Sequence, residues 1–207
     1  MSVQKTTLNK TFTNEKTLMH KQPQNAIALE KLYTHHGACT PCLLKLENKH
    51  SFVRGIGNPH AHLMLIGEAP GKNEDEQGMP FVGKSGMLLT KALNCLGVDR
   101  KDVFITNCVK CRPPQNRKPT PQETKLYKDI LIKEIEIIQP KVICTLGSTA
   151  LESLMEEPVK ITALLGKELL FHHTLLIPTY HPAYLLRNPQ KFESWLADLC
   201  KALRLSE

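Results

Sequence analysis

Short apolar runs alternate with amphipathic stretches along most of this chain. Apolar runs of this length predict buried strands, and they lie at Leu63–Ile66, Val103–Thr106, Val142–Leu146 and Leu175–Ile177. Apolar residues at helical spacing predict helices over Ala26–Tyr33, Gly86–Leu96, Gln122–Ile138, Thr149–Glu156 and Phe192–Leu205. The alternation predicts an α/β fold in which a mainly parallel sheet carries helices on both of its faces.

The start of the chain has a different composition. Residues 1–25 are rich in Thr, Asn, Lys and Gln, and they offer few apolar side chains from which a core could be built. We therefore expect a disordered or weakly ordered lead-in over residues 1–25 and a single domain over residues 26–207. The sequence contains no internal repeat that would indicate a second domain.

The overall composition narrows the class of protein. Of the 207 residues 41% are hydrophobic, which suits one domain with a sizeable core. The net charge of +7 favours a polyanionic partner such as a nucleic acid. No apolar run approaches the length of a membrane span, and residues 1–25 are too polar for a signal peptide. The chain has seven cysteines, and without an export signal we expect them to be reduced thiols or metal ligands. We expect a cytoplasmic protein that is a monomer.

One loop is rich in residues suited to binding. It runs from Gly67 to Gly83, directly after the first predicted strand, and combines glycines, prolines and carboxylates with one aromatic residue, Phe81. Loops at the carboxyl ends of parallel strands are where α/β proteins place their chemistry. Glycine lets the backbone approach a ligand closely, and proline stiffens that approach. We interpret this segment as a binding loop rather than a solvated linker.

The same loop ends in a pattern that is typical of nucleotide-binding P-loops, G-x-x-x-x-G-K-[ST], over Gly78–Ser85. A P-loop follows a buried strand, whereas the residues before Gly78 are charged. Pro80 also removes a backbone donor that a phosphate cradle would use. We interpret the match as accidental and keep a nucleotide-binding protein as an alternative hypothesis.

Two Cys-x-x-Cys pairs predict a metal centre. They are Cys39–Cys42 and Cys108–Cys111, and such pairs are typical of zinc and iron–sulfur sites. Cys39 and Cys42 lie in a predicted loop, and Cys111 opens a proline-rich loop, so these three cysteines are the expected ligands. Cys108 directly follows a strand, and its side chain can instead face the core.

Two further strand ends carry candidate site residues. Asn107 follows the second predicted strand, and its amide offers a donor and an acceptor that suit the edge of a nucleobase. His181 follows the fourth predicted strand, in a loop marked by the proline after it. Then come Leu185, Leu186 and Arg187, whose apolar pair beside a cation is typical of a wedge for base steps with a phosphate anchor.

Taken together, these segments resemble the uracil-DNA glycosylase superfamily, and specifically its type-4, iron–sulfur branch. The matching text runs from Cys39 to Pro189, about three quarters of the chain. The motifs occur in one order and are Gly55-Ile-Gly-Asn-Pro59, Gly67-Glu-Ala-Pro-Gly71, Pro80-Phe-Val-Gly83, Thr106-Asn107, Lys110-Cys-Arg-Pro-Pro114, Asn116-Arg117 and Tyr180-His-Pro-Ala-Tyr-Leu-Leu-Arg187. Several independent motifs in order make this match far more specific than the P-loop pattern.

The resemblance implies a three-layer αβα sandwich and an enzyme of base excision repair. Such an enzyme flips uracil out of DNA, hydrolyses its N-glycosidic bond and leaves an abasic site. By this resemblance Phe81 stacks on the flipped uracil, Asn107 binds the polar edge of the base, and His181 contacts its O2 oxygen. A carboxylate, Glu68 or Glu74, would favour the oxocarbenium-like sugar electrostatically.

The resemblance also implies roles for the binding loop and for the wedge. The residues expected to contact or line the base pocket are Gly67, Glu68, Ala69, Gly71 and Glu74, the last of them near the C5 atom of the base. The residues expected to fill the vacated base stack and to contact DNA are Leu185, Leu186 and Arg187. The catalytic set implied is Glu68, Asn107 and His181.

Two departures from related sequences bear on the mechanism. Another branch of the superfamily has Gly-Gln-Asp-Pro-Tyr at this loop, with an Asp that orients water, where this chain has Ala69; type-4 members share the alanine. Covalent uracil-binding relatives trap DNA through a histidine in a basic insertion, and we see no such insertion after Asn107. We therefore expect hydrolysis with turnover, and keep a covalent, non-turnover binder as an alternative.

The metal centre departs from the type-4 pattern at one ligand. The resemblance implies a 4Fe–4S cluster, of which three ligands are Cys39, Cys42 and Cys111. Where type-4 members place the fourth cysteine, this chain has Tyr127. We expect a cluster with an altered fourth ligand, and the candidates for it are Cys108, Tyr127 and His35. A cluster that is incomplete or absent stays open at this point.

Overall fold

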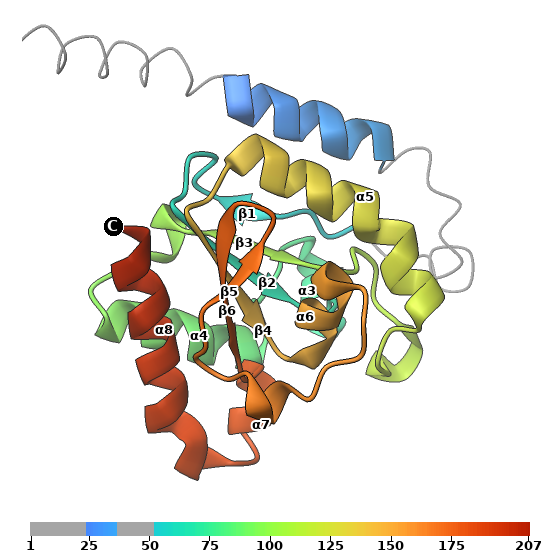
Figure 1. Cartoon of the computed structure of the whole chain (residues 1–207). Helices are drawn as coiled ribbons and strands as arrows, with labels where there is room; N and C mark the ends of the chain where they lie inside the picture. Colours follow the sequence, from blue (N-terminus) through green and yellow to red (C-terminus); the bar gives the residue numbers. More distant parts are fainter. Residues whose placement is uncertain (1–23, 37–51) are drawn as a thin grey trace, which may run out of the picture.

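The computed structural model of this chain describes residues 24–36 and 52–207. Six strands form one sheet in the order β1-β3-β2-β4-β6-β5 (Figure 1). They are β1 (Ile56–Gly57), β2 (Leu63–Gly67), β3 (Phe104–Asn107), β4 (Val142–Leu146), β5 (Leu169–Phe171) and β6 (Thr174–Thr179). The four inner strands are parallel, and the two edge strands pair antiparallel with their neighbours. The predicted mainly parallel sheet is thus confirmed.

Helices cover both faces of this sheet. The first spans residues 24–36, and the others are α3 (Lys72–Gln77), α4 (Lys84–Cys95), α5 (Pro121–Ile138), α6 (Ser148–Met155), α7 (Pro182–Leu185) and α8 (Phe192–Ser206). Among the turns between them is a short 3₁₀ helix at Arg100–Asp102. Figure 1 shows α5 and the helix over residues 24–36 lying together on one side of the molecule and α8 on the other.

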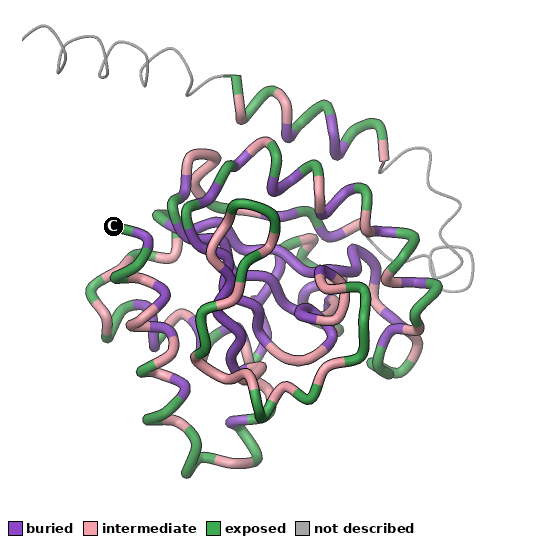
Figure 2. The backbone as a smooth tube through the Cα atoms, viewed as in Figure 1, coloured by how far each residue is buried: buried purple, intermediate pink, exposed green. Residues whose placement is uncertain are grey.

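The core is divided in two by the sheet. Successive side chains of a strand point to opposite faces, so Met64 and Ile66 join a core with the helix over residues 24–36, α5 and α6. Leu63 and Leu65 join a second core with α4 and α8. Buried residues accordingly run along the strands and the inner sides of the helices (Figure 2). The predicted αβα sandwich is confirmed.

Each strand and helix predicted from the apolar pattern is present, with ends that shift by a few residues. Residues 24 and 25, expected in the lead-in, are already helical. Helix α3 was not predicted, because its six residues are all polar and only Glu74 is buried. Strands β1 and β5 were not predicted either, because they have two and three residues and are only partly buried.

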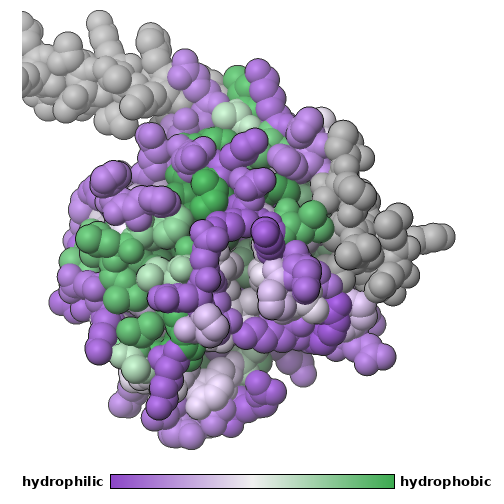
Figure 3. Space-filling model, turned by 45° about the vertical axis from the view of Figure 1, so that its right-hand side comes forward, coloured by the Kyte–Doolittle hydropathy of each residue, from purple (hydrophilic) through white to green (hydrophobic). Residues whose placement is uncertain are grey.

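The surface carries a mixture of residue types. Hydrophilic residues cover most of the face drawn in Figure 3, and apolar residues form patches between them. Among the described residues no helix is both long enough and apolar enough to cross a membrane.

Candidate active site

The predicted site residues converge at the carboxyl ends of β2 and β3. These strands are parallel neighbours, and Gly67 is paired with Asn107 in their register. A pocket of about 230 Å³ opens there, small beside the roughly 300–1,000 Å³ of sites for drug-sized ligands. Seven of the predicted residues line it, namely Glu68, Ala69, Gly71, Glu74, Phe81, Asn107 and His181.

Asn107 brings a buried acceptor to this pocket. Its side chain is 3% exposed, and its Oδ1 atom has no hydrogen-bond partner within the described part of the chain. Gly67 makes this arrangement possible, because a Cβ atom there would lie 2.5 Å from Asn107 Oδ1 and 2.3 Å from the ring of Phe81. Buried acceptors are almost always satisfied in proteins. The amide oxygen is therefore suited to accept a hydrogen bond from a ligand.

His181 is held as a neutral donor. Its Nδ1 atom accepts a hydrogen bond from the backbone N–H of Ala183 at 3.1 Å, so the ring proton of the neutral form lies on Nε2. Burial lowers the pKa of the imidazole to about 4, against an opposing effect of Glu74. A neutral imidazole at physiological pH can donate from Nε2 to a developing anion without starting as a cation.

Phe81 forms an aromatic wall of the pocket. Its ring is 5% exposed and lies 5.7 Å from the ring of His181, with 30° between the two planes. The residue has φ 54°, in the left-handed region that non-glycine residues rarely adopt. The aromatic ring is placed to stack against a flat ligand between itself and the polar groups.

Glu74 is fixed by the backbone around it. Its carboxylate accepts hydrogen bonds from the N–H groups of Gly71 at 3.1 Å, Val82 at 2.9 Å and Gly83 at 2.7 Å. The side chain lines the pocket, as expected, but it also joins the two ends of the binding loop. A carboxylate with three such donors is strongly held in place.

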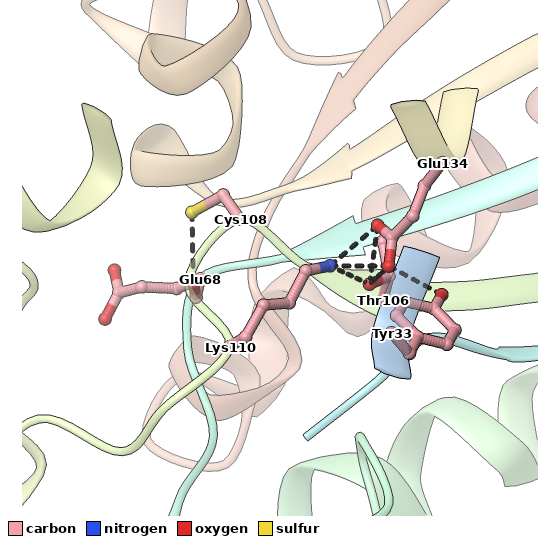
Figure 4. Close-up of polar contacts among 6 residues, drawn as sticks. All are labelled: Tyr33, Glu68, Thr106, Cys108, Lys110 and Glu134. Carbon is pink, nitrogen blue, oxygen red and sulfur yellow. Dashed lines mark hydrogen bonds and ion pairs between the residues drawn. The ribbon is translucent and has the colours of Figure 1, made fainter. Parts of the chain in front are cut away.

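Glu68 is oriented through both its side chain and its backbone. Thr149, in the first turn of α6, donates to Glu68 Oε2 at 2.5 Å. The Glu68 carbonyl accepts from the Cys108 thiol at 3.0 Å and from the N–H of Val109. Figure 4 shows the Glu68 carboxylate pointing away from Cys108. The carboxylate is thus presented to the pocket while the backbone is fixed to the segment that follows β3.

A buried ion pair supports this segment from behind. Lys110 Nζ lies 2.6 Å from Glu134 Oε2, and both side chains are fully buried. The Glu134 carboxylate also accepts from Thr106 and, at 2.7 Å, from the Tyr33 hydroxyl (Figure 4). The sequence did not reveal this network, because its four residues come from separate elements. It ties Thr106, directly before Asn107, and Lys110, three residues after it, to α5 and to the first helix.

The predicted wedge residues are separated by the structure. Leu185 is 3% exposed and belongs to the core with α4 and α8. Leu186 is 50% exposed and Arg187 is exposed as well. Tyr184, not predicted, is 37% exposed and stacks on Tyr180 at 4.8 Å. The exposed tip beside the pocket therefore consists of Tyr184, Leu186 and Arg187, with Leu185 as its anchor.

The expected metal ligands are only partly within the described residues. Cys39 and Cys42 lie outside them. Cys111 and Tyr127 are both buried in the same core, together with Cys108. Burial raises the pKa of the Cys108 thiol to about 12, and this thiol donates to Glu68. Over residues 24–36 and 52–207, no cluster of three or more His, Cys, Asp or Glu side chains could hold a metal ion.

Comparison with known families adds a decisive observation. Residues 54–204 match the model of the uracil DNA glycosylase superfamily. The chain belongs to the uracil-DNA glycosylase superfamily. The match contains every pocket residue described above and leaves Cys39 and Cys42 before its start.

This glycosylase-family chain is similar to type-4 uracil-DNA glycosylases from several organisms. The protein of Thermotoga maritima is 47% identical over 152 residues, which cover 72% of this chain and 79% of the relative. That of Pyrobaculum aerophilum is 43% identical over 179 residues, which cover 83% and 91%. That of Archaeoglobus fulgidus is 41% identical over 172 residues, which cover 79% and 86%. The predicted resemblance to the type-4 branch is confirmed.

The P-loop pattern has a different setting in this superfamily member. Gly78 ends helix α3 with φ 69°, and Lys84 and Ser85 begin α4. No strand leads into the pattern, and the turn between the two helices instead carries Phe81 into the pocket. These glycines therefore shape the loop that holds the aromatic wall.

Proposed function

We propose that this protein removes uracil from DNA by hydrolysing the N-glycosidic bond, leaving an abasic site for base excision repair. The observation that carries the proposal is the buried Oδ1 of Asn107, which has no partner in the described part of the chain and shares a pocket with the neutral imidazole of His181 and the ring of Phe81. An acceptor and a donor that lie beside one aromatic face suit the N3–H and O2 groups of a flipped uracil.

The proposed reaction uses differential stabilisation of charge. Breaking the glycosidic bond leaves negative charge on the uracil ring, which the Nε2 proton of His181 stabilises as it develops. Asn107 accepts from the N3–H of the base and holds it in register. The sugar becomes cationic, and the carboxylate of Glu68, oriented by Thr149, would favour that charge and guide the attacking water. The role of Glu68 toward water replaces the one that Ala69 cannot perform.

Base flipping is assigned to the exposed tip. Extruding a base costs a few kcal/mol of stacking and pairing. Leu186, which is half exposed, would enter the vacated stack, and Arg187 would contact a phosphate. Leu185 supports the tip from the core rather than contacting DNA. The net charge of +7 agrees with binding that weakens as salt rises.

We also propose that the protein carries a 4Fe–4S cluster. Its ligands would be Cys39, Cys42 and Cys111, with Tyr127 at the usual position of the fourth cysteine. Cys108 suits the role poorly, because its thiol donates to the backbone carbonyl of Glu68 in the binding loop. The cluster would act structurally, tying together loops distant in sequence and so contributing to folding stability.

The test is an excision assay on single- and double-stranded oligonucleotides that contain one uracil, followed by alkali to cut abasic sites. We expect cleavage at uracil and none at thymine in the same context, without nucleotide and with EDTA present. Excision that required ATP, together with loss of ATP hydrolysis in Lys84→Ala, would instead favour the nucleotide-binding alternative. A DNA–protein adduct stable on a denaturing gel, without turnover, would favour the covalent binder.

A further inference from the structure

The backbone of Phe81 is held in a conformation that a phenylalanine rarely adopts. Its φ of 54° lies in the left-handed region, and such strain persists only where neighbouring groups over-determine the position. Close packing supplies part of this, because a Cβ atom at Gly86 would lie 1.9 Å from the Phe81 carbonyl oxygen. The peptide groups before and after Phe81 are also hydrogen-bonded to charged side chains, which fix their orientation.

Arg100 binds this turn through its carbonyl groups. The guanidinium Nη1 donates to the Phe81 carbonyl at 2.8 Å and to the Thr90 hydroxyl on α4 at 3.2 Å, and Nη2 donates to the Pro80 carbonyl. A planar guanidinium that donates to two successive carbonyls fixes their relative orientation. A lysine ammonium at the same place would act as a point charge without this geometry.

Glu74 binds the same turn through its N–H groups. Its carboxylate accepts from Val82 at 2.9 Å and from Gly83 at 2.7 Å. The carbonyl groups of Pro80 and Phe81 thus accept hydrogen bonds from the Arg100 cation, and the N–H groups of the next two residues donate to the Glu74 carboxylate. Glu74 is buried and Arg100 is partly buried, and hydrogen bonds to charged groups are strengthened where water is excluded.

Arg100 itself stays outside the base pocket. The residues that line the pocket include Phe81 and Glu74 but not Arg100. An effect of Arg100 on uracil excision would therefore have to pass through the position of the Phe81 ring, whose edge packs on Gly67 beside Asn107.

We propose that Arg100 is a positioning residue for base stacking: with Glu74 it clamps the strained turn so that the Phe81 ring faces the flipped uracil. The inference rests on the proposed function, since it assigns a role in the same reaction. Arg100 was not predicted as a site residue from the sequence, and it lies outside the quoted motifs in a short 3₁₀ helix.

The test is a double-mutant cycle on the full chain. Single-turnover uracil excision is measured for wild type, Arg100→Gln, Phe81→Ala and the double variant. The control is Lys101→Gln, which removes a charge from the same 3₁₀ helix, where Lys101 pairs with the exposed Asp99. We expect Arg100→Gln to lower the rate about 10- to 100-fold, but less than about threefold when Phe81 is already alanine. Arg100→Lys should recover part of the loss and replaces Arg100→Gln if that variant does not fold.

Equal losses in both backgrounds would overturn the proposal, because they would show an action that bypasses the ring. So would a loss no larger than that of Lys101→Gln. The position of the ring is read independently by NMR, as nuclear Overhauser contacts between the Phe81 ring and the α-protons of Gly67. These contacts should weaken in Arg100→Gln and persist in Lys101→Gln. If the contacts weaken in Arg100→Gln and persist in Lys101→Gln, but the wild-type protein does not excise uracil, the proposed function is refuted and the clamp stands. If the contacts are unchanged in Arg100→Gln, the clamp is refuted.

Discussion

Replacing Asn107 by alanine should change activity and stability in opposite directions. Asn107 Oδ1 is buried and has no hydrogen-bond partner over residues 24–36 and 52–207, and a buried acceptor left without a partner costs folding free energy on the order of 1–3 kcal/mol. Truncation removes that cost and leaves a small space beside Gly67. The free energy of unfolding should therefore stay unchanged or rise, whereas truncating a satisfied buried amide lowers it.

The same substitution removes the proposed acceptor for the N3–H of uracil. The base would then be buried with an unpaired donor, at a cost of roughly 1–3 kcal/mol in the transition state. At about 1.4 kcal/mol for each tenfold change, single-turnover excision should fall about 5- to 150-fold. The assays are excision of uracil from an oligonucleotide under enzyme excess and thermal unfolding of the same preparation.

Asn94→Ala is the matched control, since Asn94 is exposed on α4 and its truncation should leave the excision rate unchanged. Two results would refute the reasoning. A wild-type rate in Asn107→Ala would mean that the amide does not read the base. A fall in melting temperature, at roughly 2–4 °C per kcal/mol for a domain of this size, would mean that the amide is structural.

Three other outcomes are expected. Because the pKa of His181 is lowered to about 4, the excision rate should stay constant from about pH 8 to pH 5 and fall toward pH 4. The free energy of unfolding should decline by up to about 3 kcal/mol as the pH drops from 6.5 toward 4, because His181 binds a proton at higher pH in the unfolded state than in the folded state. A rate that halves near pH 6.5 would contradict this. Leu186→Ala should impair excision from duplex more than from single strands, whereas Leu185→Ala should lower the free energy of unfolding by about 2–5 kcal/mol; equal activity losses on both DNA forms would exclude a wedge. Anaerobic protein should contain iron and sulfide, and more of both in Tyr127→Cys than in wild type, with little change in Cys108→Ser; metal-free or zinc-only protein would exclude the cluster.

The sequence predicted those strands and helices whose pattern of apolar residues is explained by a single type of secondary structure. Buried parallel strands are apolar runs, and β4 was predicted with both ends in place. Helix α3 gave no such signal, because a helix without an apolar stripe has no periodicity to detect. It forms through its caps and through Glu74, whose role depends on loop amides eight and nine residues later.

The sequence allowed us to predict which residues lie at the candidate site, but not which hydrogen bonds and packing contacts they make. Asn107, His181 and Phe81 were recognised from position and resemblance, and the structure brings them to one pocket. The strained turn at Phe81, its contact with Arg100 and the link from Thr149 to Glu68 depend on tertiary geometry. Leu185 and Leu186 are adjacent and chemically identical, so only the packing of α7 could tell the buried residue from the exposed one.

The central sheet also separates two groups of proposed functional residues, which lie in the cores on its opposite faces. Phe81, the proposed stacking residue, and Leu185, which anchors the exposed tip, lie in the core formed with α4 and α8. Cys108, Cys111 and Tyr127, on the side of the proposed metal, rest in the core formed with α5 and α6. Asn107 lies at the end of a strand between the two layers. We therefore expect loss of the proposed cluster to disturb the core that contains Cys108, directly after Asn107, more than the core that contains Phe81.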